Sequence, residues 1–225
     1  MPLNREHIGG PLHVFLPHNI REGLHALYAL VRFRKSDRAR GLVEDCLGAI
    51  NRCWDPRRGW DRRYLEDELG LRLVEIDGPF ITGLARAIGP LVKLYAATAY
   101  GPALALALRL TEQVLDEHWL EAGAYDPARM GTHVHSVTCV MSSVAQLADL
   151  MGDMRLLARV KTFYDNGLND LRDALGWAIE STRPEANPEP ADLFTACRLF
   201  PGERHQFRKM DPKQARLSPL IRLPN

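Results

Sequence analysis

The chain has 225 residues, of which 46% are hydrophobic and 25% are charged, a balance typical of a globular protein with a buried core. Its 29 basic and 28 acidic residues nearly cancel, which argues against a polyanion-binding surface at the level of the whole chain and leaves a local patch open. The longest uncharged stretch, residues 94–108, is interrupted by Gly101-Pro102 and is too short to span a bilayer, so we predict no membrane partner.

Residues 1–11 carry charge and glycine where a secretory signal would need an apolar run. The four cysteines, at positions 46, 53, 139 and 197, form no CxxC pair and no disulfide-scaffold spacing. Both features predict a cytoplasmic protein with reduced thiols.

Along the chain, helical periodicity dominates. Apolar residues recur every three or four positions from Ile20 to Val31, which predicts the first amphipathic helix. Ser36-Asp37 then predicts a turn and an N-cap. A second helix follows through residues 42–54, and the segment 55–61 closes the pair.

The same plan returns twice. We predict helices over 80–98 and 103–119, joined by a turn at 100–102, and over 132–150 and 154–173, joined at Gly152-Asp153. No alternating pattern argues for a sheet. We therefore predict an all-α fold of tandem antiparallel helical hairpins, which stack into a solenoid or close into a ring.

The last part of the chain has a different composition. From Pro184 onward it contains seven prolines, scattered basic residues and no sustained helical pattern. The predicted boundaries are a helical-hairpin domain over 1–187 and a proline-rich basic tail over 188–225, irregular or partly disordered.

The connection before the third hairpin, residues 123–136, holds the first candidate site residues. His133 and His135 fall at the start of a helix, where free N–H groups favour an anion or an electron-rich oxygen. We expect them to bind substrate together with Tyr125, although both could instead cap the helix structurally. His133 and His135 could supply two metal ligands, but the sequence offers no third ligand at a suitable spacing. We therefore predict neither a metal nor a cofactor.

One stripe of the same helix is polar. Its residues are three or four positions apart and therefore lie on one face of the helix: His135, Cys139, Ser142, Gln146 and Asp149. Such a stripe normally faces solvent, and solvent is the first interpretation. In a ring of hairpins, the stripe would instead face a central cavity.

Trp177 and Glu180 lie three residues apart, and an aromatic ring beside a carboxylate is a common way to hold a sugar. We therefore expect Trp177 to bind substrate. Glycoside hydrolysis needs two carboxylates that flank the bond. We predict Glu180 and Asp126 as catalytic candidates, with Glu185 and Asp77 as further acids. The sequence contains no glycine-rich phosphate loop and no nucleophile elbow. Its basic residues are not interleaved with aromatic residues as in a nucleic-acid groove, so we predict no nucleic-acid partner.

Four segments, 16–30, 80–108, 131–153 and 163–188, resemble bacterial glycoside-hydrolase-like proteins with a six-hairpin (α/α)6 barrel, near the β-L-arabinofuranosidase type. The resemblance covers roughly residues 16 to 188. It implies an α/α toroid with a carbohydrate-sized cleft, of which three hairpins are half. The zinc-bound cysteine cluster of β-L-arabinofuranosidases has no match among the cysteines of this chain.

The resemblance implies a carbohydrate-active, glycosidase-like protein with an incomplete α/α toroid. The sequence leaves open what kind of product the chain is: a truncated, inactive gene product, a fragment, or one part of an assembly. An open end would expose apolar helix faces, which predicts self-association. The alternative is a non-catalytic helical-repeat module that binds a protein or peptide along its concave face.

Overall fold

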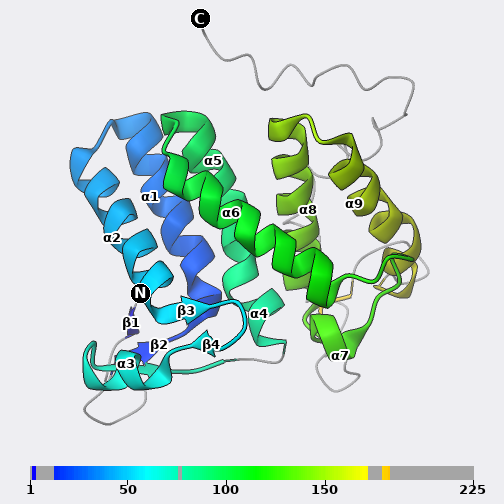
Figure 1. The fold of residues 1–225 in the computed structure, drawn as a ribbon, viewed down its shortest axis with the longest axis horizontal. Coiled ribbons are helices and arrows are strands. Elements are labelled where there is room, and N and C mark those ends of the chain that lie inside the picture. The colour runs from blue at the N-terminus through cyan, green and yellow to red at the C-terminus, as the bar shows by residue number, and fades with distance from the viewer. Residues whose placement is uncertain (1, 4–12, 76–77, 172–178, 183–225) are drawn as a thin grey trace, which may run out of the picture.

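The computed structural model describes residues 2–3, 13–75, 78–171 and 179–182 (Figure 1). These residues are mostly helical, which confirms the all-α prediction. Trp177, Asp77, Glu185, Cys197 and the predicted tail lie outside the described residues.

Six helices of 11 residues or more carry the described fold. They are α1 (Ile20–Arg34), α2 (Asp37–Cys53), α5 (Ile88–Thr98), α6 (Gly101–Gln113), α8 (Val134–Met151) and α9 (Met154–Asn166). The shorter helices are α3 (Arg62–Asp67), α4 (Pro79–Thr82), α7 (Pro127–Met130), the 3-10 turns η2 (Pro17–Asn19), η3 (Leu84–Ala87) and η5 (Gly167–Leu171), and the π-helical η4 (Val114–His118).

The turns between paired helices have the chemistry that the sequence predicts. Ser36 is the N-cap of α2, and its Oγ accepts a hydrogen bond from the Ala39 amide at 3.2 Å. Gly152 ends α8 in the left-handed conformation, φ 65°, which glycine adopts without a steric cost. Asp153 then caps α9 through the Arg155 and Leu156 amides.

The predicted helix over 80–98 is interrupted. Gly83 separates α4 from η3 with φ −109° and ψ −106°, outside the helical region. A Cβ at this position would overlap the carbonyl oxygen of Pro79 and lie 3.2 Å from the Cβ of Pro17. The prediction of one continuous helix is therefore wrong, because the backbone leaves the helical conformation at Gly83, where a Cβ would overlap the preceding turn.

In the described part of the chain, five short strands lie at one end of α1 and α2 (Figure 1). The strand β2 (His13–Phe15) pairs with β1 (Pro2–Leu3) in antiparallel fashion and with β5 (Leu71–Leu73) in parallel. The strands β3 (Trp54–Asp55) and β4 (Gly59–Trp60) form an antiparallel pair. The segment 55–61 thus closes the first pair of helices through strand pairing as well as a turn.

The long helices pack in sequence order. α1 contacts α2 and α5, α5 contacts α6 and α8, and α8 contacts α9 (Figure 1). The turn η3 contacts both α1 and α8, so it lies between the first and third of these pairs. A single apolar core runs through all of them and includes Leu24, Leu91 and Val140.

Within the described residues, one helical stretch, Pro79–Thr98, is long and apolar enough to cross a membrane. Most of it is buried inside the protein, and a buried core helix passes the same test.

Candidate functional site

The N-terminus of α8 brings the two predicted histidines together with Glu180. His133 is the N-cap residue of α8, which agrees with the predicted position of both histidines at the start of a helix, and it forms an antiparallel bridge with Ser181. The Val134 amide donates to the Glu180 carbonyl at 3.0 Å, and the Thr182 amide donates to the Thr132 carbonyl at 3.0 Å. Backbone pairing therefore holds the segment 179–182 against the start of α8.

The side chain of His133 links Glu180 to Ser136. Its Nε2 lies 2.9 Å from Glu180 Oε1, and its Nδ1 lies 2.7 Å from Ser136 Oγ. A neutral ring fits this pair by donating its Nε2 proton to the carboxylate and accepting the Ser136 hydroxyl proton. Ser136 is fully buried, so its hydroxyl orients the imidazole and is not accessible as a nucleophile.

A third histidine, His18, enters the site from the turn before α1. Its ring centroid lies 5.7 Å from that of His133, and His133 lies 5.8 Å from His135. His18 Nδ1 lies 2.7 Å from the Thr82 carbonyl oxygen, which can only accept. Nδ1 therefore carries the proton, and a neutral His18 has its lone pair on Nε2.

A buried arginine supports this arrangement. Arg86, on η3, is 2% exposed; it donates from Nη1 to the His18 carbonyl at 2.7 Å and from Nη2 to Glu22 Oε1 at 2.8 Å. Glu22 also accepts from Arg21 Nη1 at 3.1 Å. We refer to the following residues as the histidine cluster: His18, His133, His135, Glu180, Arg86 and Glu22.

Burial and positive charge keep two of these histidines neutral. Burial, and after it the Arg86 cation, lower the pKa of His135 to about 4. The pKa of His18 is lowered by burial and then by Arg86, against a raising effect of its bond to Thr82. Burial raises the pKa of Glu22, but Arg86 and Arg21 outweigh burial, so the net shift is downward. At neutral pH, His18 and His135 are therefore neutral, and the Glu22 carboxylate is ionised.

Tyr125 and Asp126 have local structural contacts. The Tyr125 hydroxyl donates to the Gly131 carbonyl at 2.6 Å and lies 3.2 Å from Thr182 Oγ1, so Tyr125 is tied to the segment that carries Glu180. Asp126 is the N-cap of α7: its Oδ1 accepts from the Ala128 amide, and its Oδ2 lies 3.6 Å from Arg129 Nε. Trp177 lies outside the described residues. The binding and catalytic roles of these residues stay predictions.

The polar stripe of α8 does not face solvent along its length. Cys139 and Ser142 are 5% and 4% exposed, whereas Gln146 is half-buried and Asp149 is exposed. The interpretation that the stripe faces solvent is wrong for Cys139 and Ser142, because α8 packs on several sides. The predicted apolar face, which includes Val134, is buried as expected.

No group of three or more histidine, cysteine or acidic side chains among the described residues is arranged to hold a metal ion. The rings of His18 and His133 are neighbours, but three of their nitrogens already face a hydrogen-bond partner: Thr82, Ser136 or Glu180. The arrangement favours hydrogen bonding and proton transfer.

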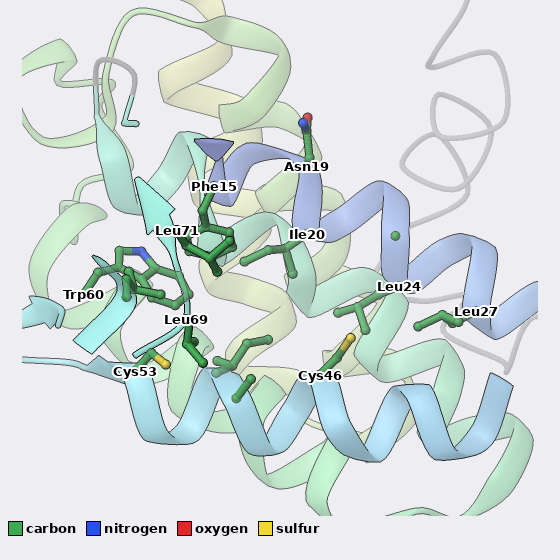
Figure 2. Close-up of a pocket in the computed structure, with 14 residues that line it drawn as sticks. Phe15, Asn19, Ile20, Leu24, Leu27, Cys46, Cys53, Trp60, Leu69 and Leu71 are labelled. Atoms are coloured by element: carbon green, nitrogen blue, oxygen red, sulfur yellow. The ribbon is translucent and has the colours of Figure 1, made fainter. Parts of the chain in front are cut away.

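A separate cavity of about 160 Å³ lies between α1, α2 and the strands (Figure 2). Its lining is apolar apart from Asn19, and includes Leu24, Cys46, Cys53 and Trp60. Binding sites for metabolites usually add several convergent polar groups, which this cavity lacks. Burial raises the pKa of the Cys46 and Cys53 thiols, which makes them poor nucleophiles.

Sequence reasoning missed His18, Glu22 and Arg86. A signal was present: His18, Arg21, Glu22 and His25 recur at helical spacing, as the stripe of α8 does. The pairing of Arg86 with Glu22 joins residues 64 positions apart, and no local pattern reveals it. No family model, no curated protein and no solved structure matches the chain.

Proposed function

We propose that this chain is carbohydrate-active and glycoside-hydrolase-like, with the histidine cluster as its sugar-binding site. The observation that carries the proposal is the convergence of His18, His133, His135 and Glu180 from three separate segments, with the buried Arg86 bonded to the His18 carbonyl. Neutral imidazoles donate and accept hydrogen bonds and carboxylates accept them, which is what the hydroxyl groups of a sugar require.

An incomplete α/α toroid is the architecture that we propose for the chain. The packing order supports it: α1, α5 and α8 contact one another in turn, and each contacts its own partner, α2, α6 or α9. In such an arrangement, α1, α5 and α8 form the inner layer. Glu22 lies on α1, Arg86 on η3 just before α5, and His133 and His135 at the start of α8, in keeping with a site on that layer, while His18 on η2 and Glu180 in the segment 179–182 complete the cluster.

Glu180 is the proposed general acid/base, and His133 is its positioning partner. The 2.9 Å contact between Nε2 and Oε1 fixes the carboxylate and supplies a proton path. Hydrolysis also needs a second carboxylate. Asp126 is the candidate from the sequence, and Glu22, which the fold brings into the cluster as an ionised group, is the alternative.

The test combines calorimetric titration of mono- and disaccharides with hydrolysis assays on a panel of aryl glycosides. We expect Glu180→Gln to slow hydrolysis by about 10²–10⁴-fold with little change in sugar affinity, because it removes proton transfer and keeps the shape. Glu112→Gln, an exposed position on α6, is the matched control.

Sugar binding that His18→Asn and His133→Asn leave unchanged would contradict the proposed site. If the chain binds sugars but hydrolyses no glycoside, its function is sugar binding without catalysis. A chain that binds no sugar and instead binds peptides along α1, α5 and α8 would favour the non-catalytic repeat module.

A further inference from the structure

The apolar cavity between α1, α2 and the strands is larger than the voids that a protein core normally leaves (Figure 2). Native interiors are packed as densely as organic crystals, and few of their voids exceed the size of a water molecule. A volume of about 160 Å³ is several times larger, so this cavity has room for a ligand. None of the described residues that line it belongs to the histidine cluster, which makes it a second candidate site.

Small side chains on α2 create this space. Cys46, Ala49 and Cys53 line the cavity at intervals of three and four residues, so they share one face of the helix. The larger Leu24 and Leu27 line the cavity from α1. The cavity therefore exists because one face of α2 is short of side-chain volume.

The cavity is long and narrow. Its lining runs from Ile20 to Leu27 on α1 and from Cys46 to Cys53 on α2. At 1.5 Å per residue, each of these spans is about 10 Å long. A volume of about 160 Å³ over that length gives a mean cross-section of about 16 Å². This shape fits one unbranched chain of carbon atoms better than a compact or branched group.

The lining also decides the chemistry of the ligand. Among the described residues that line the cavity, none is charged, and Asn19 directs its amide away from it (Figure 2). A charged or polar group placed inside would lose its hydrogen bonds to water and find no replacement. Carbon chains have no hydrogen bonds to lose, and their transfer out of water is favourable.

The opening of the cavity lies between α2 and the residues that follow α3. Ala49 and Leu69 line the cavity and are exposed to solvent, Leu69 to 41%. A chain that enters between them keeps its polar end at the opening, in water.

We infer that this cavity binds an unbranched alkyl chain of about six carbons, with the polar end of the ligand outside. The size follows from cavities of about 150 Å³ lined by leucine, isoleucine and phenylalanine, which take up benzene and its six carbons. The site goes beyond the proposed sugar-binding function and does not depend on it.

The test is calorimetric titration of the full chain with 1-butanol, 1-pentanol, 1-hexanol and 1-octanol. We expect the affinity to rise about fourfold for each methylene up to 1-hexanol, because each added methylene leaves water. The affinity should then level off, because further carbons lie outside the opening. The branched isomer of 1-hexanol, 3,3-dimethyl-1-butanol, should bind about tenfold more weakly, because it overpacks a narrow cavity.

Two variants fill the cavity from different positions. Cys46→Leu and Ala49→Leu should each lower the affinity for 1-hexanol by about tenfold or more. Gly48→Ala, on the same helix, is the matched control, since a Cβ there meets nothing within 4 Å, and it should leave the affinity unchanged. Thermal unfolding checks that each variant is folded, and 1-hexanol should raise the melting temperature of the parent protein and of Gly48→Ala.

The inference is overturned if the folded parent protein binds no alcohol, or if Cys46→Leu and Ala49→Leu bind 1-hexanol as tightly as the parent does. A gain that continues undiminished to 1-octanol would also overturn it, because it would show adsorption to exposed apolar surface. Equal affinity for the branched isomer would rule out a site shaped for a chain. All of these results leave the proposed sugar site standing.

Discussion

The contact between α5 and α8 is a direct test of the fold that positions the site. Gly89, on α5, has an ordinary helical backbone, yet a Cβ on it would lie 2.7 Å from Ser143 Oγ on α8. The same Cβ would lie 3.5 Å from the Cβ of Ser143, an ordinary contact. The hydroxyl oxygen alone therefore blocks a side chain at Gly89.

The expected free energies follow from these distances. In an open helix, glycine to alanine gains about 1 kcal/mol. Here Ser143 Oγ, which donates to the Cys139 carbonyl at 2.8 Å, must move, and overpacking of this kind costs about 1–3 kcal/mol. The difference between the two terms is a net destabilisation of about 0–2 kcal/mol for Gly89→Ala. In a Ser143→Ala background the clash is gone, and the same substitution should stabilise by up to about 1 kcal/mol.

Urea unfolding, followed by circular dichroism, measures all four proteins of this double-mutant cycle. The expected coupling between Gly89 and Ser143 is about 2 kcal/mol. Gly48→Ala is the matched control, since Gly48 lies in α2 and a Cβ on it would meet nothing within 4 Å, and it should stabilise by up to about 1 kcal/mol. If Gly89→Ala stabilises as Gly48→Ala does, or if the coupling is zero, α5 and α8 do not approach as described.

Two further predictions concern pH and the apolar cavity. His25 and His135 titrate near 4 when folded and near the ordinary value of 6.5 when unfolded, so the unfolded state binds more protons between these values. Unfolding free energy should therefore be highest above pH 6.5 and fall towards pH 4, by at most roughly 3 kcal/mol for His135 and by less for His25, whose charge solvent screens more. His25→Gln should flatten the urea-unfolding profile between pH 7 and 4.5, and a profile that rises on acidification would refute the reasoning. Cys46→Leu places extra carbon atoms in the 160 Å³ cavity and should raise the unfolding free energy by about 1 kcal/mol. Destabilisation by Cys46→Leu, measured in the same assay, would mean that no space exists there.

The local features of the fold were predictable from the sequence. The helix through Ile20 and Val31, the Ser36 cap and the turn at Gly152-Asp153 all agree with the structure. Each depends on residues within a few positions of one another: a repeat of apolar side chains, a hydroxyl that reaches a nearby amide, a glycine that adopts a positive φ. The position of His133 and His135 at the start of a helix belongs to the same class.

The site was only partly predictable. The sequence indicated His133, His135 and Glu180, but not that His133 would bond to Glu180 or that His18 would lie beside them. It also left open whether the polar stripe of α8 faced solvent, and packing buried Cys139 and Ser142. The sequence indicated Asp126 as a catalytic acid, whereas in the structure its Oδ1 accepts a hydrogen bond that caps a helix.

The sequence by itself determined where the six long helices lie and where most of them begin, because these properties come from hydrogen bonds and side chains close together in the chain. It did not give the ends of two of them: the predicted helices 103–119 and 154–173 leave the α-helical form after Gln113 and Asn166. Tertiary structure alone decided the burial of Arg86 and its bonds to His18 and Glu22. Those features arise where segments more than 60 residues apart exclude water from one another, and a charge buried there must find its partners across that distance.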